Sequence, residues 1–173
     1  IGNGGGSMAG SASGDIIVSG ASLTLNSAFR YAYATIGNGD PFHAYSGLAG
    51  TGAASGDITL NITDLTTLVE TGNGAWIGNE ADPHSKESGN VVLTTGALNV
   101  MADNDADGTA LGDIIVADLG TSSSTGGDFT LALTDTTGSS ISDDTGDEMV
   151  SEYFEEGVFF DSAHTLSIVS TDD

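Results

Sequence analysis

The chain has 173 residues, of which 38% are hydrophobic, so it is long enough for one domain with its own core. Its 25 acidic and 2 basic residues give a formal net charge of −23, which excludes the basic surface that binds nucleic acid or anionic lipid. It has no cysteine, which excludes disulfides and Cys-based zinc sites, and it has no apolar run long enough to insert into a membrane as a helix.

Two short motifs recur along the chain. Ile-Gly-Asn occurs at residues 1–3, 36–38 and 77–79, and Gly-Asp, or Gly-Asn in one copy, precedes an apolar run at positions 14, 56, 89, 112 and 127. In each run apolar and polar residues alternate, which is the pattern of a half-buried β-strand. The residues expected to face inward are Ile16, Val18, Ile58, Leu60, Ile62, Val91, Leu93, Ile114, Val116, Phe129, Leu131 and Leu133.

In chain order, residues 14–26 predict two short strands with a bend at Gly20 between them. Residues 29–36 predict a strand with Ala34 and Ile36 inward and tyrosines on the outer wall. Residues 56–70 follow a second loop and begin with the next alternating run, and residues 91–102 repeat the two-strand pattern of the first unit, with Leu98 and Val100 also inward. The anchors at 112 and 127 then begin two further strands.

The Gly-Asp and Gly-Asn anchors are unequally spaced, but the apolar register after each one is the same. A solenoid has this property, because each coil contacts only its neighbours and insertions go into outer loops. The sequence therefore predicts an all-β fold, a parallel β-helix with irregular loops. If the asparagines of Ile-Gly-Asn align on successive coils, their side-chain amides are expected to form a hydrogen-bonded ladder.

Residues 138–173 differ from the repeats, since they are acidic and contain an aromatic stretch. We expect Met149, Tyr153, Phe154 and Val158 to lie on one side of a short helix, and residues 164–169 to form a strand. Natural proteins cover the open end of a solenoid. The predicted organisation is therefore β-helix coils over residues 1–137 and an acidic cap or subunit-docking segment over residues 138–173.

The segment Tyr-Ala-Thr-Ile-Gly-Asn-Gly at residues 33–39, followed by a loop and Ser-Gly-Asp-Ile-Thr-Leu at residues 55–60, resembles the repeat of filamentous-haemagglutinin-type bacterial surface and secreted proteins. In that family a Tyr-Ala-Gln-Ile-Gly-His/Asn-Gly-Gly motif precedes a Ser-Gly-Asp-Ile strand. The resemblance covers roughly residues 1–135 and implies a parallel β-helix with an extracellular role in adhesion or surface structure. Thr35 stands where Gln is common, and Trp76 replaces the Tyr-Ala entry of the third copy.

A candidate metal site is the run Asp-Asn-Asp-Ala-Asp-Gly at residues 103–108. The carboxylates of Asp103, Asp105 and Asp107 alternate, and Thr109 offers a backbone carbonyl, which suits the oxygen-rich coordination of calcium. The twelfth position of the loop is Ile114 and not Glu, so the full helix-loop-helix calcium motif is not present. The alternative is a solvated acidic loop between two coils.

Three classes of function remain. The preferred hypothesis is a non-enzymatic structural protein of the bacterial surface, a fibre subunit or adhesin stalk that stacks end to end with itself or with flanking repeats. A carbohydrate-binding module is the alternative, with Trp76 and the tyrosines Tyr31, Tyr33 and Tyr45 as a stacking patch. An acidic glycosidase or lyase ranks lowest, because Arg30 and Lys86 are the only cationic side chains available for an acidic substrate.

Overall fold

The computed structural model describes residues 1–2, 11–27, 34–39, 54–70, 74–79, 87–102, 113–116, 128–136, 138–143, 157–160 and 166–170. Every regular element in these ranges is a β-strand. The same ranges contain no helix long and apolar enough to span a bilayer. The expectation of an all-β fold is confirmed for this part of the chain.

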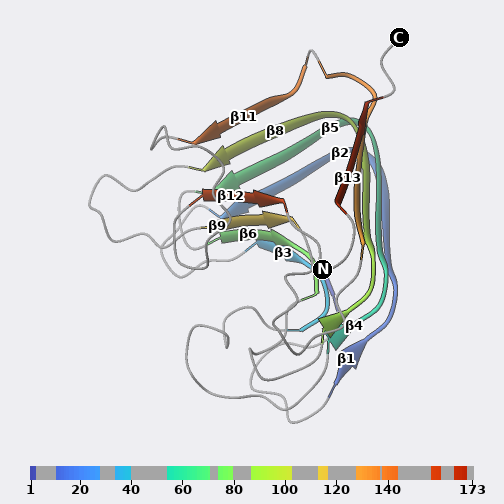
Figure 1. Cartoon of the computed structure of the whole chain (residues 1–173). Coiled ribbons are helices and arrows are strands. Elements are labelled where there is room, and N and C mark those ends of the chain that lie inside the picture. The colour runs from blue at the N-terminus through green and yellow to red at the C-terminus, as the bar shows by residue number, and fades with distance from the viewer. Residues whose placement is uncertain are drawn as a thin grey trace, which may run out of the picture.

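The strands form three sheets, and every pairing between them is parallel (Figure 1). The three-stranded sheet contains β1 (Ala12–Ser13), β4 (Ala54–Ser55) and β7 (Glu87–Ser88). The four-stranded sheet contains β3 (Ala34–Ile36), β6 (Gly74–Ile77), β9 (Asp113–Val116) and β12 (Gly157–Phe160). The six-stranded sheet contains β2 (Ile16–Ser27), β5 (Ile58–Glu70), β8 (Val91–Ala102), β10 (Phe129–Leu133), β11 (Ser140–Asp143) and β13 (Leu166–Ser170).

Consecutive strands of the chain belong to the three sheets in a fixed order. The chain passes from the three-stranded to the six-stranded to the four-stranded sheet as β1, β2, β3, then again as β4, β5, β6, and again as β7, β8, β9. Each strand pairs with the strand at the same place in the next round. We call each such round a layer. Parallel neighbours require a long connection between them, and here the other two sheets and the loops supply it.

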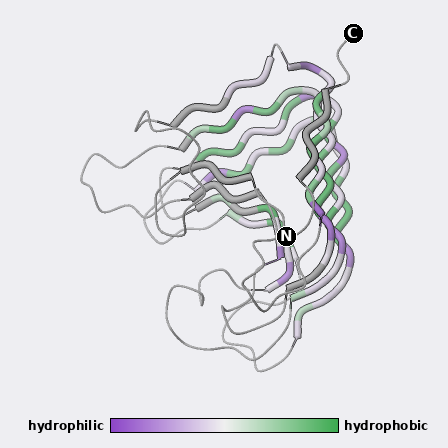
Figure 2. The backbone as a smooth tube through the Cα atoms, in the orientation of Figure 1, coloured by the Kyte–Doolittle hydropathy of each residue, from purple (hydrophilic) through white to green (hydrophobic). Residues whose placement is uncertain are grey.

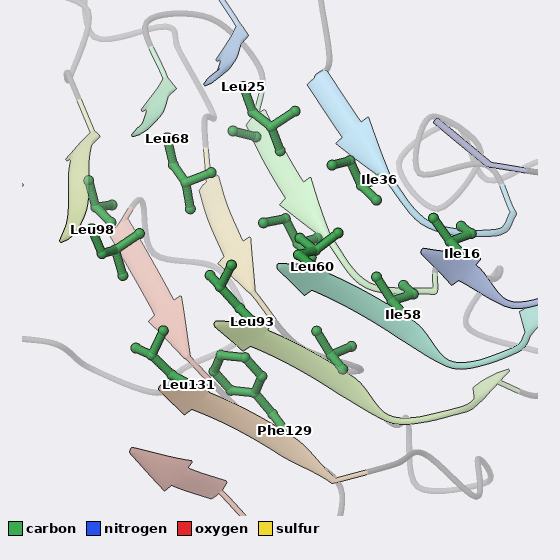
Figure 3. Close-up of a cluster of buried hydrophobic side chains, with 14 residues drawn as sticks. Ile16, Leu25, Ile36, Ile58, Leu60, Leu68, Leu93, Leu98, Phe129 and Leu131 are labelled. Carbon is green, nitrogen blue, oxygen red and sulfur yellow. The ribbon is translucent and has the colours of Figure 1, made fainter. Parts of the chain in front are cut away.

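The predicted inward residues whose burial the structure describes form the core or pack against it. Along the six-stranded sheet, Ile16 is in register with Ile58, Val91, Phe129 and Leu166, and the row beginning at Val18 continues through the same strands. Figure 2 shows hydrophobic and hydrophilic residues alternating along the long strands. The labelled side chains of Figure 3 gather between the sheets, and within the core cluster the fully buried members are Ile36, Ile58, Leu60, Leu68, Ile77, Leu93, Leu98 and Phe129 among others.

The bend predicted at Gly20 lies within one strand and does not separate two. β2 runs unbroken from Ile16 to Ser27, and its register with β5 shifts between Gly20 and Ser22. β5 shifts against β8 at the corresponding place, between Ile62 and Leu65. The long strands thus turn a corner through a local irregularity and keep pairing on both sides of it. The expectation of two separate short strands was wrong for this reason.

Strands of residues 138–173 join the same sheets. β10 and β11 pair with the two halves of β8, β12 pairs with β9, and β13 pairs with β10. The strand expected at residues 164–169 is confirmed by β13. Val158, which was expected on a short helix, lies instead in β12, and the other three residues of that prediction lie outside the described residues. Whether this segment is a cap or a docking segment stays a prediction.

Candidate functional site

The most concentrated polar structure of the described residues is a ladder of buried asparagines, which we call the inner ladder. Asn38 and Asn79 follow β3 and β6, and each is only 1% exposed. The side-chain Nδ2 of Asn38 donates to Asn79 Oδ1 at 3.2 Å, and its backbone N–H donates to the same oxygen at 3.0 Å. The hydrogen-bonded alignment predicted for the Ile-Gly-Asn motifs is confirmed for these two copies.

The asparagines of the inner ladder also donate hydrogen bonds to backbone oxygens next to the loops. Asn38 Nδ2 donates to the backbone oxygens of Ser55 and Gly14, both at 2.9 Å, and Asn79 Nδ2 donates to Gly56 O at 2.8 Å. Asn38 and Ser55 stand at the two ends of one connection, between β3 and the strand pair β4 and β5. The two motifs of each repeat therefore meet in space. Because the asparagine amide closes the loop at its base, the length of the loop is free to vary.

Glycine precedes each of these asparagines because the backbones of successive layers lie close together. A Cβ atom at Gly37 would overlap the backbone oxygen of Gly78, and a Cβ atom at Gly2 would overlap that of Gly37. The backbone hydrogen bonds follow the same column, from Gly37 N to Ile1 O at 2.9 Å and from Gly78 N to Ile36 O at 3.0 Å. The first Ile-Gly pair therefore stacks beneath the second and third.

A second ladder, here the outer ladder, lies at the entry to the long strands. The side-chain oxygen of each member accepts the backbone N–H of the next: Asp57 N to Asp15 Oδ1 at 3.1 Å, Asn90 N to Asp57 Oδ1 at 2.8 Å, and Asp128 N to Asn90 Oδ1 at 3.0 Å. All four members are exposed. Four of the five Gly-Asp and Gly-Asn anchors of the sequence, those at positions 14, 56, 89 and 127, supply this ladder. Asp113 of the fifth anchor instead begins β9 in the four-stranded sheet. The sequence analysis treated the anchors as strand starts, and the recurring Asp or Asn at one position was the signal for the side-chain hydrogen bonds.

A third link between layers is a hydrogen bond inside the core. Thr66 Oγ1 donates to Thr95 Oγ1 at 3.0 Å, and Thr95 Oγ1 donates to Ala97 O at 2.9 Å. Both threonines are 0% exposed. They sit at the corner where β5 and β8 change register. Sequence periodicity missed them, because each belongs to a Thr-Thr pair, and the pattern does not show which member is buried or that a second threonine contacts it from the next strand.

All three sets of contacts join neighbouring layers through hydrogen bonds. The outer ladder does so with exposed side chains, three of them aspartates. In the inner ladder and the threonine pair, neutral amides, hydroxyls and backbone groups satisfy one another, and buried polar groups that are paired in this way hold a single arrangement. The inner ladder is closed to solvent. The arrangement can therefore join one layer to the next, and its buried polar atoms are engaged within the chain.

The residues predicted from sequence to bind ligands are not brought together in the described part of the chain. Asp103, Asp105, Asp107 and Thr109 lie outside the described residues, so the predicted calcium site stays a prediction. Within the described ranges, no three His, Asp or Glu side chains are grouped to hold a metal ion. The predicted aromatic patch also stays a prediction. Trp76 lies in β6, in register with Thr35, but Tyr31, Tyr33 and Tyr45 lie outside the described residues.

No protein-family model, curated protein or solved structure matched this chain.

Proposed function

We propose that the chain is a parallel β-helix and that its function is structural, as the subunit of a bacterial surface fibre or the stalk of an adhesin. The observation that carries the proposal is the inner ladder, in which a buried asparagine of one layer bonds both the next layer and the base of its own loop. The repeated visiting order of the three sheets supports the solenoid, since each layer then contacts only its neighbours.

The composition supports a location outside the cell. A net charge of −23 keeps such a rod soluble, and cations of an extracellular medium screen its self-repulsion. The resemblance of residues 33–39 and 55–60 to filamentous-haemagglutinin-type repeats points to the same setting. In this proposal calcium, held by Asp103, Asp105 and Asp107, is a stabilising ion of one outer loop.

Electron microscopy of the purified chain tests the proposal, first with calcium and then with a chelator. We expect filaments or stiff rods whose length is a multiple of the strand spacing of about 4.8 Å. Their loss on chelation assigns calcium a role in assembly, and their persistence restricts calcium to a local role. Compact, featureless particles in both conditions contradict the fibre proposal.

A further inference from the structure

β2 is an open edge of the six-stranded sheet. It is the last strand in the sheet order and pairs with β5 alone among the described strands (Figure 1). Ile16 N donates to Asp57 O, toward β5. Because successive residues of a strand direct their backbone groups to opposite sides, the N–H and C=O groups of Ile17 and Ser19 point away from β5. Such a row is a template for another strand.

The core is less completely buried at this edge. Ile16 and Leu25 of β2 are 7% and 8% exposed, whereas Ile58 and Leu68, in the same rows of β5, are 0% and 1% exposed. Val18 is half-buried and its row partner Leu60 is fully buried. The core rows therefore continue to the edge, and one more layer in the same register would complete their burial. That layer must bring apolar residues at every second position.

The opposite edge of the same sheet offers such a strand. β13 pairs with β10 and is the other end of the sheet order. Leu166 and Ile168 hold the register positions of the rows that begin at Ile16 and Val18. β13 and β2 also run in the same direction, since every pairing between them is parallel. A parallel strand with this register fits the open edge of β2 without a slip.

We propose that β2 receives β13 of a second copy of this chain, in parallel and with Ile16 opposite Leu166, so that copies add head to tail. This interface is heterologous and does not close on itself, so it produces a linear filament. The inference rests on the proposed structural function and names its partner and polarity. Because every copy carries the same net charge of −23, assembly is expected to grow with ionic strength.

Disulfide mapping tests the register directly, because the chain has no cysteine of its own. In the proposed interface Ile17 lies opposite Ser167, at the spacing of adjacent strands, which a disulfide can span. We expect the double variant Ile17→Cys/Ser167→Cys, oxidised at about 0.5 M salt, where the Debye length is about 4 Å, to give a ladder of dimers, trimers and larger species on a non-reducing gel. The matched pair Ile17→Cys/Ser170→Cys, displaced by about 10 Å along the strand, gives no ladder.

Three results overturn the inference: no cross-links in the first pair, equal ladders in both pairs, or dimers from Ile17→Cys alone, which indicate two β2 edges meeting head to head. If microscopy shows filaments but any of these three results is obtained, the proposed structural function is still supported. The copies are then joined through an interface other than β2 and β13.

A second variant tests the edge without cysteines. Ile17→Pro removes an outward N–H and is tolerated on an edge strand, whereas Ile17→Thr keeps that N–H. We expect the proline variant to stay monomeric with an unchanged far-ultraviolet circular dichroism spectrum, and the threonine variant to assemble. Assembly of a folded Ile17→Pro protein at the wild-type concentration contradicts the proposal.

Discussion

The inner and outer ladders use the same hydrogen bond in opposite surroundings. In both, a side-chain oxygen accepts the backbone N–H of a residue in a neighbouring layer. The inner ladder is buried and contains only asparagine among the described copies, whereas the outer ladder is exposed and contains three aspartates and one asparagine. The difference follows from the cost of desolvating a charge, which is large in the core and small at the surface.

The two ladders are also expected to contribute differently to the stability of the fold. An exposed carboxylate or amide competes with water for its partner, so each rung of the outer ladder adds little net stability. The inner amides are themselves buried, and removing one leaves its part-buried backbone acceptors without that donor. The inner ladder is therefore expected to control stability, and the outer ladder to align the entry of each strand.

The largest effect is expected from moving a charge between the two environments. Asn38→Asp places a carboxylate oxygen where Nδ2 now donates to Gly14 O and Ser55 O. We expect a loss of about 4 kcal/mol in the free energy of unfolding, because the buried charge then faces only acceptors. The matched change in the outer ladder, Asn90→Asp, is expected to cost less than about 1 kcal/mol. Urea denaturation of both variants measures the difference, and equal losses contradict the comparison.

The second largest loss of stability is expected where the backbones of successive layers lie closest together, at Gly37 and Gly78. In Gly37→Ala the added Cβ overlaps Gly78 O, so the layers must separate, and a loss of at least about 3 kcal/mol is expected. Gly20→Ala is the control, because its Cβ meets nothing closer than Ser22 O at 3.8 Å. That variant is expected to change stability by less than about 1 kcal/mol. Thermal unfolding of both variants measures the difference. A Gly37→Ala protein as stable as wild type would show that the backbones at Gly37 and Gly78 are not in such close contact.

The core threonines give a smaller effect. Thr66→Val keeps the volume of the side chain but removes its hydrogen bond to Thr95, and Thr95 Oγ1 still donates to Ala97 O. A loss of about 1 kcal/mol is expected. Thr67→Val, on the opposite face of the same strand, controls for the general effect of valine in β5. Equal stabilities of the two variants in urea would assign the Thr66 hydrogen bond no net contribution.

The smallest effect is expected in the outer ladder. Asp57→Asn keeps an oxygen that accepts Asn90 N and removes one of two negative charges on adjacent strands. We expect stability to rise by less than about 0.5 kcal/mol at low salt and the gain to vanish as salt screens the remaining repulsion. Urea midpoints at two salt concentrations measure it. A clear loss of stability at either concentration would show that the charge itself holds the rung.

The repeating part of this fold could be predicted from the sequence where a local pattern is sufficient to identify a buried face. Alternation after the anchors at positions 14, 56, 89 and 127 identified the inward rows from Ile16 to Phe129, because strand periodicity reports which face is buried. The Ile-Gly-Asn copies also predicted the alignment of Asn38 with Asn79. A motif repeated at unequal spacing still implies a repeated position in space when the register around it is constant.

The remaining features depend on contacts between layers, which no single segment of sequence contains. The bonds from Asn38 to Gly14 and from Thr66 to Thr95 join residues that are distant in sequence, and their partners are fixed only by the register. Val158 lies in a strand and not in the expected short helix, because parallel pairing with β9 outweighed a local helical spacing. Likewise, Gly20 was predicted as a break, but pairing with β5 continues on both sides of the bend.

Amide hydrogen exchange of the monomeric chain at low salt, resolved residue by residue, tests the central claim most directly. If the inner ladder joins the layers in solution, the backbone N–H of Asn38, which donates to Asn79 Oδ1, exchanges only on global unfolding, as do the amides of Ile58 and Val91 in the inter-layer bonds. The amide of Ile17 on the open edge is predicted to exchange orders of magnitude faster. Exchange of Asn38 as fast as that of Ile17 would contradict the account, because the inner ladder would then not join the layers in solution.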